Sequence, residues 1–302
     1  MKNLQSNFLF LIAFSFLPIS KNFAQEKGNA YYGNANYGTN KIDQFRPQEA
    51  EFENDSTIVV GARVLMNVKP SSYVVIIGLS QVGTNAEICN QLMNQRIEGL
   101  SEKLASFGIS KNDIKKDFIS QIPVYEYETE KKLFSKTYQE VPAGFYLNKN
   151  LHIAYKNAET FEKILAEAAA FDIYDIVKVE YIVENFNPIY DSLRSEAINL
   201  INKKIQNFKK LGLTFNNRFY IVAENYASIY PTERYRRYAA FSTPSLQNVK
   251  RGSTINQVNK QETYFYEKVP NNQFDIIINP LVVEPVPQFT YSLKVKYILK
   301  RQ

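Results

Sequence analysis

Two long stretches of the chain pair an apolar stripe at helical spacing with a terminal glycine, and they constrain the fold more than any other feature. In the first, Thr84 and Glu87 fit a capping box, and Gly108 ends the helix. The second begins at Asn187-Pro188 and ends before Gly212. An apolar stripe must be buried against another element. The predicted stripes are Cys89, Met93, Ile97, Leu100, Leu104 and Phe107 in the first helix, and Ile189, Leu193, Ala197, Leu200, Lys204 or Ile205, Phe208 and Leu211 in the second.

Runs typical of β-strands surround these helices. Residues 126–139 read as a charged hairpin, and Asn157 is expected to cap a shorter helix with Phe161, Ile164, Leu165 and Ala168 on its inner face. The order of elements predicts an α+β fold, in which antiparallel sheets carry two long amphipathic helices and one shorter helix on one face. The similar phrases 104–109 and 208–213 hint at two related halves. The strand runs are 57–68, 73–82, 117–127, 144–155, 173–183, 217–227, 274–283 and 290–299.

The N-terminal 55 residues are expected to lie outside this fold. Lys2 and the apolar run 8–18 predict a signal peptide over residues 1–24, cleaved after Ala24; the alternative is a buried N-terminal helix. The run is too short for a transmembrane anchor, and no other segment reaches 18 apolar residues. Residues 25–55 read as a flexible leader, and residues 56–302 as the folded domain. We therefore expect a periplasmic protein without a transmembrane anchor, with cell-envelope association or secretion as alternatives.

The composition excludes several kinds of site. The chain has 302 residues with one Cys and one His, which excludes a disulfide framework, a zinc finger and an iron–sulfur centre. His152 is the only base for a nucleophilic triad, and it lies in an alternating run that predicts a surface or edge position. Cys89 lies on the apolar stripe, where a small buried hydrophobe is expected rather than a redox-sensing thiol. We expect no catalytic residues, no cofactor and no metal.

Residues 231–268 are the unusual part of the sequence. They carry 7 basic and 3 acidic side chains, whereas residues 56–230 are nearly neutral. Nucleic-acid binding is not expected, because it needs a basic face on the folded body. The segment is longer than ordinary connections, which favours either a solvated insertion or a contact with an envelope surface or a protein partner. The candidate partner contacts are Arg234, Tyr235, Arg236, Arg237 and Tyr238.

Several short motifs, taken in order, resemble the SIMPL-domain family. Val68-Lys69-Pro70-Ser71 follows the first strand, although Ser71 replaces the acidic residue of the family pattern. The stretch from Phe107 to Ile114 is similar to its L-G-I-x-x-x-D-I motif, and Pro123-Val124-Tyr125-Glu126-Tyr127 is similar to P-x-Y-x-Y. The helix from Ala197 to Gly212 matches more loosely, with bulkier residues at several small positions. The resemblance covers residues 56–229 and the last strand.

The resemblance implies a function class but no site chemistry. Members of the family are exported α+β proteins, some of which assemble into large rings, and some are named for defence against oxidative stress. The resemblance therefore implies a non-enzymatic homo-oligomer that acts by assembly or by binding envelope components, with a role in stress resistance. The alternative is an envelope hydrolase that uses carboxylates, for which the alternating Glu126, Glu128 and Glu130 are the visible candidates.

Overall fold

The computed structural model describes residues 30–31, 50–132, 135–240 and 262–300. The fold is α+β, with mostly antiparallel sheets and three α-helices among the described residues. The chain divides into two compact units, one formed by Met1–Asn34 with Arg237–Tyr264 and the other by Ala35–Arg236 with Phe265–Gln302. The expected signal peptide, most of the expected leader and residues 241–261 of the basic segment lie outside the described residues.

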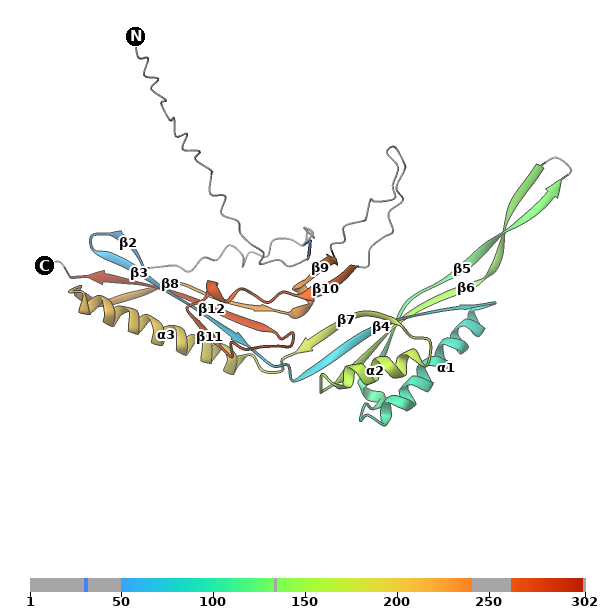
Figure 1. Ribbon diagram of the computed structural model, residues 1–302, viewed down its shortest axis with the longest axis horizontal. Coiled ribbons are helices and arrows are strands. Elements are labelled where there is room, and N and C mark those ends of the chain that lie inside the picture. Colours follow the sequence, from blue (N-terminus) through green and yellow to red (C-terminus); the bar gives the residue numbers. More distant parts are fainter. Residues whose placement is uncertain (1–29, 32–49, 133–134, 241–261, 301–302) are drawn as a thin grey trace, which may run out of the picture. The chain divides into compact units, whose positions relative to one another are not determined.

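The larger unit contains a four-stranded antiparallel sheet that we call layer A together with its two helices (Figure 1). The strand order is β5-β6-β4-β7, and α1 contacts β4, β6 and α2. The strands are β4 (Ser72–Gly83), β5 (Ile114–Lys132), β6 (Ser135–Tyr155) and β7 (Asp175–Ile182). The helices are α1 (Ala86–Ala105) and α2 (Thr160–Ala169), and a short 3-10 turn, Lys111–Asp113, precedes β5.

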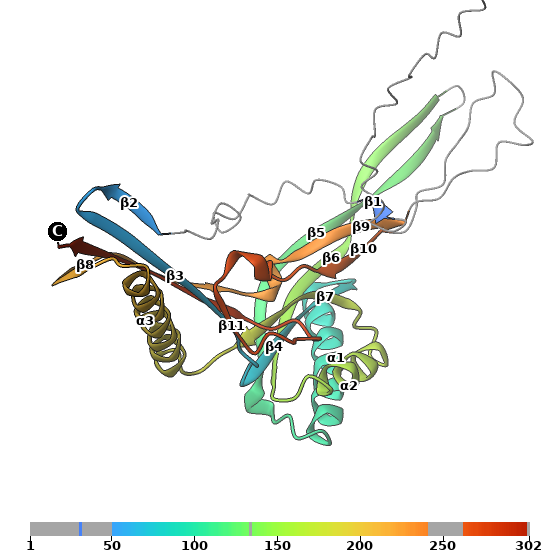
Figure 2. The same ribbon diagram turned by 60° about the vertical axis from the view of Figure 1, so that its left-hand side comes forward.

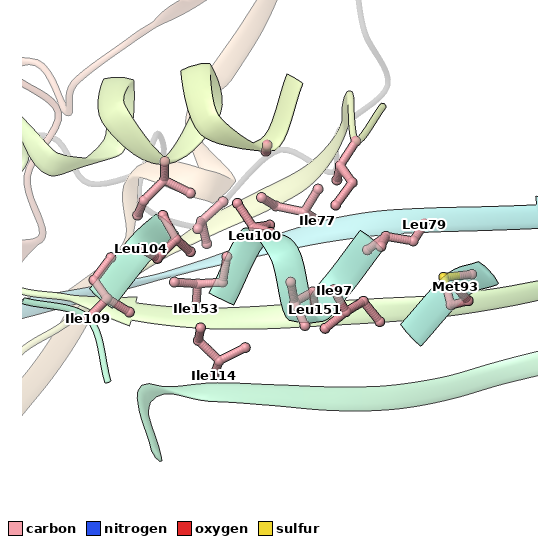
Figure 3. Packing of buried hydrophobic residues seen from close by; sticks show 14 of the residues in the cluster. Ile77, Leu79, Met93, Ile97, Leu100, Leu104, Ile109, Ile114, Leu151 and Ile153 are labelled. Carbon is pink, nitrogen blue, oxygen red and sulfur yellow. The ribbon is translucent and has the colours of Figure 1, made fainter. Parts of the chain in front are cut away.

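The predicted stripe of α1 forms the core of layer A (Figure 3). Its side chains pack against the inward-facing residues of β4 and β6, and Ile164 and Ala168 of α2 join the same cluster. Burying one such side chain stabilises the fold by about 1.5–3 kcal/mol. Phe107 is the exception, because it lies beyond the end of α1 and is partly exposed. The buried stripe is Cys89, Met93, Ile97, Leu100 and Leu104.

A second sheet of the same unit, with one helix, forms layer B (Figures 1 and 2). Its order is β11-β3-β12-β8, and β2 also pairs with β3. The pairings are antiparallel except between β11 and β3, which run parallel. The helix packs on β3 and β12. The elements are β2 (Glu51–Asn54), β3 (Thr57–Asn67), α3 (Asn187–Lys210), β8 (Phe215–Ile229), β11 (Ile276–Ile278) and β12 (Gln288–Leu299).

The inner face of α3 differs from the predicted stripe in its C-terminal half. Its buried residues are Leu193, Ala197, Ile201 and Ile205, which continue at four-residue steps, and Leu200 beside them is only half-buried. Leu211 follows the last helical residue and is exposed. The sequence left Lys204 and Ile205 as alternatives for one core position, and Ile205 is the buried residue.

The helix ends show which local signals are reliable. Gly108 and Gly212 both adopt a positive φ, at 79° and 94°, so the predicted glycine terminations are confirmed for both long helices. The predicted capping box of α1 is wrong by one residue, because Asn85 accepts from the backbone N–H of Ile88 at 2.8 Å. The predicted side-chain cap at Asn157 is also wrong, since α2 begins at Thr160 without such a bond.

Two segments differ from the sequence expectations in their strands. Residues 51–54, which the sequence assigned to the leader, form β2 and pair with β3. The predicted strand 274–283 contracts to β11, and Leu281 and Val283 beyond it are exposed. The strand ends at Ile278, because Asn279 after it adopts a positive φ of 55° that a β-strand does not accommodate.

A third, three-stranded sheet is formed by β1 (Ala30–Tyr31), β9 (Tyr235–Ala240) and β10 (Glu262–Tyr266), in the order β1-β9-β10. The β1–β9 pairing is antiparallel and places Ala30 opposite Ala240. The two ends of the basic segment are therefore strands rather than irregular loop.

Candidate binding surfaces

The predicted partner contacts of the basic segment are used in part by the fold itself. Arg234 is buried, and its Nε donates to the main-chain oxygen of Glu267 at 2.8 Å. The Nε of Arg236 forms an ion pair with the Glu267 carboxylate, also at 2.8 Å. Both arginines therefore fasten the start of the segment to its end, and Arg234 is enclosed rather than presented to a partner.

The other three candidates divide between a cleft and the small sheet. Tyr235 is partly exposed and lines the aromatic cleft described below. Arg237 is exposed, and Tyr238 belongs to β9, although its side chain lies outside the described residues. The sequence thus located a region of aromatic and basic side chains, and the structure separates its members into different environments.

An open cleft of about 560 Å³ lies at the end of layer A where β4, β6 and β7 carry tyrosines. Tyr73 is the direct cross-strand partner of both Tyr155 and Tyr181, so the three residues form one row across the sheet. The remaining lining residues come from α2, β7, the turn before β9, β9 itself and the loop before β12, and include Phe161, Val177, Lys178, Val179, Thr232, Tyr235, Glu284 and Pro285.

The tyrosine rings of this cleft are stacked on one another. The ring centroids of Tyr73 and Tyr155 lie 5.2 Å apart with 13° between the ring planes, and Tyr181 meets Tyr73 edge-on at 5.6 Å. The ring of Phe161 stacks on Tyr155 at 6.2 Å. This packing fixes the positions of the side chains.

The side chains of Tyr73 and Tyr155 are buried, but their phenolic hydroxyls form no hydrogen bond within the described residues. The two residues are only 4% and 5% exposed, yet neither hydroxyl has a hydrogen-bond partner among the described residues. Neither oxygen is completely enclosed, so each is reached through the cleft that both residues line. Burial raises the pKa of Tyr155 and Tyr181, and burial followed by the Glu284 carboxylate raises the pKa of Tyr73. All three phenols are therefore neutral at physiological pH.

The edge strand β8 carries an exposed apolar surface that the sequence pattern did not predict. It pairs with β12 on one side and with no described strand on the other. Four successive residues, Phe219, Tyr220, Ile221 and Val222, are each 52–62% exposed. Side chains alternate along a strand, and the pairing with β12 skips Val222 at a bulge, so these residues lie on both faces of the sheet. In the sequence, four successive apolar residues are typical of a buried strand. Their exposure therefore could not be predicted from the sequence.

The β5–β6 hairpin forms an arm that extends beyond the rest of layer A (Figure 1). Pairing of β4 with β6 stops at Gly83 and Phe145, whereas pairing of β5 with β6 continues to Lys132 and Ser135. The tyrosines Tyr125, Tyr127 and Tyr138 on this arm are more than half exposed.

The sequence candidates for catalysis lie in different parts of layer A. Glu126 and Glu128 are exposed on the arm, and the side chain of Glu130 lies outside the described residues. His152 is predicted at a surface or edge position; it lies on the inner strand β6, with a partly exposed side chain whose Nε2 is 4.0 Å from an Asp117 carboxylate oxygen. Cys89 is fully buried, its Sγ lies 3.0 Å from the main-chain oxygen of Gln81, and burial raises the pKa of its thiol. A redox-sensing thiol needs the opposite environment.

The carboxylate of Glu224 in β8 accepts hydrogen bonds from several side chains. Its Oε1 accepts from Arg194 Nη2 at 2.7 Å and from the hydroxyls of Tyr226 and Tyr291 at 2.8 Å each. These donors, Arg194 first, hold the pKa of Glu224 below its ordinary value. The network joins α3, β8 and β12 and so fixes the position of the edge strand.

Among the described residues, no helix combines the length and the apolar content that a membrane crossing requires. In the same parts of the chain, no three His, Cys, Asp or Glu side chains are grouped so that they could hold a metal ion. No protein-family model matches the sequence, and no curated protein matches it.

Proposed function

We propose that this protein is an exported, SIMPL-like, non-enzymatic protein that acts by assembling with further copies of itself. The N-terminal pattern supports export to the periplasm or cell envelope, and the ordered motifs support the SIMPL-like character with two long helices and one shorter helix. The same resemblance extends the proposal to a role in stress resistance.

The observation that carries the assembly proposal is the β8 edge, Phe219–Val222. An unpaired strand edge presents free backbone N–H and C=O groups, and natural proteins guard such edges with charge, proline or a covering element. Phe219, Tyr220, Ile221 and Val222 carry no charge and no proline, and no described element covers them. Pairing with a strand of a second copy would bury these side chains and satisfy the backbone groups together. The exposed tyrosines of the β5–β6 arm supply further contact area.

The assembly is tested by the mass of the mature protein in solution. Light scattering after size exclusion should report an oligomer, and Ile221→Lys should lower the mass to that of the monomer, because a lysine on an edge strand opposes edge-to-edge pairing. Val283→Lys is the matched control, since Val283 is 95% exposed but lies in a loop, so its mass should stay unchanged. A monomeric parent protein, or an oligomer that Ile221→Lys leaves intact, would overturn the proposal.

A further inference from the structure

We propose that the aromatic cleft at the end of layer A binds a neutral saccharide through the hydroxyls of Tyr73 and Tyr155. This inference is independent of the proposed assembly, because the cleft residues differ from those of the β8 edge.

The first step is that two hydroxyls reach the open cleft without a hydrogen-bond partner among the described residues. Polar atoms at such a surface bond to water in the free protein, and a ligand can replace that water. Tyr73 and Tyr155 are at least nine-tenths buried, and neither hydroxyl is paired with a described residue. Two unpaired hydroxyls that reach the same cleft fit a ligand that both donates and accepts hydrogen bonds.

The second step concerns the alternative of a cationic ligand. Aromatic cages bind quaternary ammonium groups through open ring faces, with the cation within about 6 Å of the ring centre. Here Tyr73 is stacked on Tyr155 and forms a T-shaped pair with Tyr181, and Tyr155 also stacks on Phe161. Because Tyr155 is stacked on both Tyr73 and Phe161, its hydroxyl edge rather than its ring face is available in the cleft.

The third step concerns the charge of the ligand. The cleft has one carboxylate, Glu284, and one ammonium group, Lys178. Lys178 is paired with Glu180 at 2.6 Å, whereas Glu284 has no ion-pair partner among the residues described. An anionic ligand would be repelled by Glu284, while ligand hydroxyls can donate to its oxygens.

A sugar matches the remaining surface. Its hydroxyls serve as both donors and acceptors for the phenols, for Thr232 and for Glu284, and its C–H surface can lie against the apolar side chains of Val179 and Pro285. The cleft volume of about 560 Å³ falls within the range of small-molecule sites, about 300–1,000 Å³.

The test uses the mature full-length protein and four named probes, namely cellobiose, maltose, N,N′-diacetylchitobiose and choline. Saturation-transfer NMR and calorimetry should detect binding of at least one disaccharide in preference to choline. Tyr155→Phe keeps the ring and removes the hydroxyl, so it should weaken that binding roughly 2- to 10-fold, the range expected for one lost hydrogen bond. Its melting temperature should be unchanged or raised, because the deleted hydroxyl has no partner in the protein.

Matched variants separate a binding role from a structural one. Tyr138→Phe on the exposed arm should leave saccharide binding unchanged, and Glu284→Gln should weaken it. The proposal is overturned if no disaccharide binds, if choline binds more tightly than the sugars, or if Tyr155→Phe and Glu284→Gln both bind like the parent. Repeating the titration with Ile221→Lys keeps this outcome separate from the outcome of the assembly test.

Discussion

Layers A and B each bury one face of a sheet beneath helices, but they do so with different numbers of helices. Layer A covers four strands with α1 and α2, whereas layer B covers five strands with α3 alone. In layer A the two helices and the sheet share one closed apolar cluster. In layer B the single helix packs on β3 and β12 and leaves the edge strand β8 with exposed apolar residues. Layer A also exposes Phe118, Ile119 and Ile122 on its edge strand β5, so an exposed apolar edge is common to both layers and helix coverage alone does not explain it.

The two layers also differ in the polar groups they bury. Layer B encloses Asn67 and Gln288, which bond to each other and to neighbouring backbone. The buried polar side chain of layer A, among the residues described, is Ser101, which bonds within its own helix. A buried network between distant segments fixes their alignment, whereas a bond inside one helix does not. Layer B thus depends on polar pairing for its register to a greater extent.

The strongest test of the comparison removes one core leucine from each layer. Leu104→Ala in α1 and Leu193→Ala in α3 should each lower the free energy of unfolding by about 2–5 kcal/mol, the range for a fully buried leucine. Urea unfolding followed by circular dichroism measures this. Leu211→Ala serves as the control because Leu211 is exposed, and its effect should be within about 0.5 kcal/mol of zero. An unchanged unfolding midpoint for either core variant would mean that its helix does not close the layer.

We expect a smaller loss of stability when the buried polar side chains of the two layers are removed. The side chain of Gln288 donates to Asn67 Oδ1 at 2.9 Å and accepts from the backbone N–H of Val269 at 2.8 Å. Gln288→Ala leaves that buried N–H unpaired, so it should cost about 1–3 kcal/mol. Ser101→Ala in α1 should be nearly neutral, since Ser101 Oγ bonds to the Ile97 carbonyl of the same helix and alanine favours helix. Equal losses in the two variants, measured by urea unfolding, would contradict the difference between the layers.

Local signals allowed most of the elements to be predicted but not their division into layers. The apolar stripe of α1 and the glycines after both long helices were read correctly because they depend on periodicity and backbone conformation. The turn at Lys69-Pro70 looks like an ordinary hairpin connection, yet β3 and β4 on its two sides belong to different sheets. Which strands pair is decided by partners far apart in the sequence, and these leave no local pattern.

The candidate sites were less predictable for the same reason. Tyr73, Tyr155 and Tyr181 become neighbours only through the register of three strands. A tyrosine at the end of each of three predicted strands was the available signal, but it required the strand order. Arg234 shows the converse, because its charge suggested a surface contact whereas its contact with Glu267 encloses it.

The smallest expected effect concerns the pH dependence of layer B. Because Arg194 and two tyrosine hydroxyls lower the pKa of Glu224 in the folded protein, the ionised form stabilises the fold. This stabilisation is present above the ordinary glutamate pKa of about 4.3, and it is lost as the pH falls through the lower folded-state value. Glu224→Gln should therefore lower the stability at neutral pH and show a weaker loss of stability in acid. Urea midpoints measured from neutral to acidic pH give both quantities.

Glu98→Gln in α1 provides the matched change in layer A, because Glu98 is exposed and forms no ion pair or hydrogen bond with a described residue. Its acid profile should follow that of the parent protein. The Glu224 carboxylate is itself partly exposed, so its neutral-pH effect should fall below that of Gln288→Ala. If Glu224→Gln retained the full acid sensitivity of the parent, the network that joins α3 to β8 would not be the acid-sensitive contact. The two layers would then respond to pH alike, and the edge strand would owe its position to the backbone pairing with β12 alone.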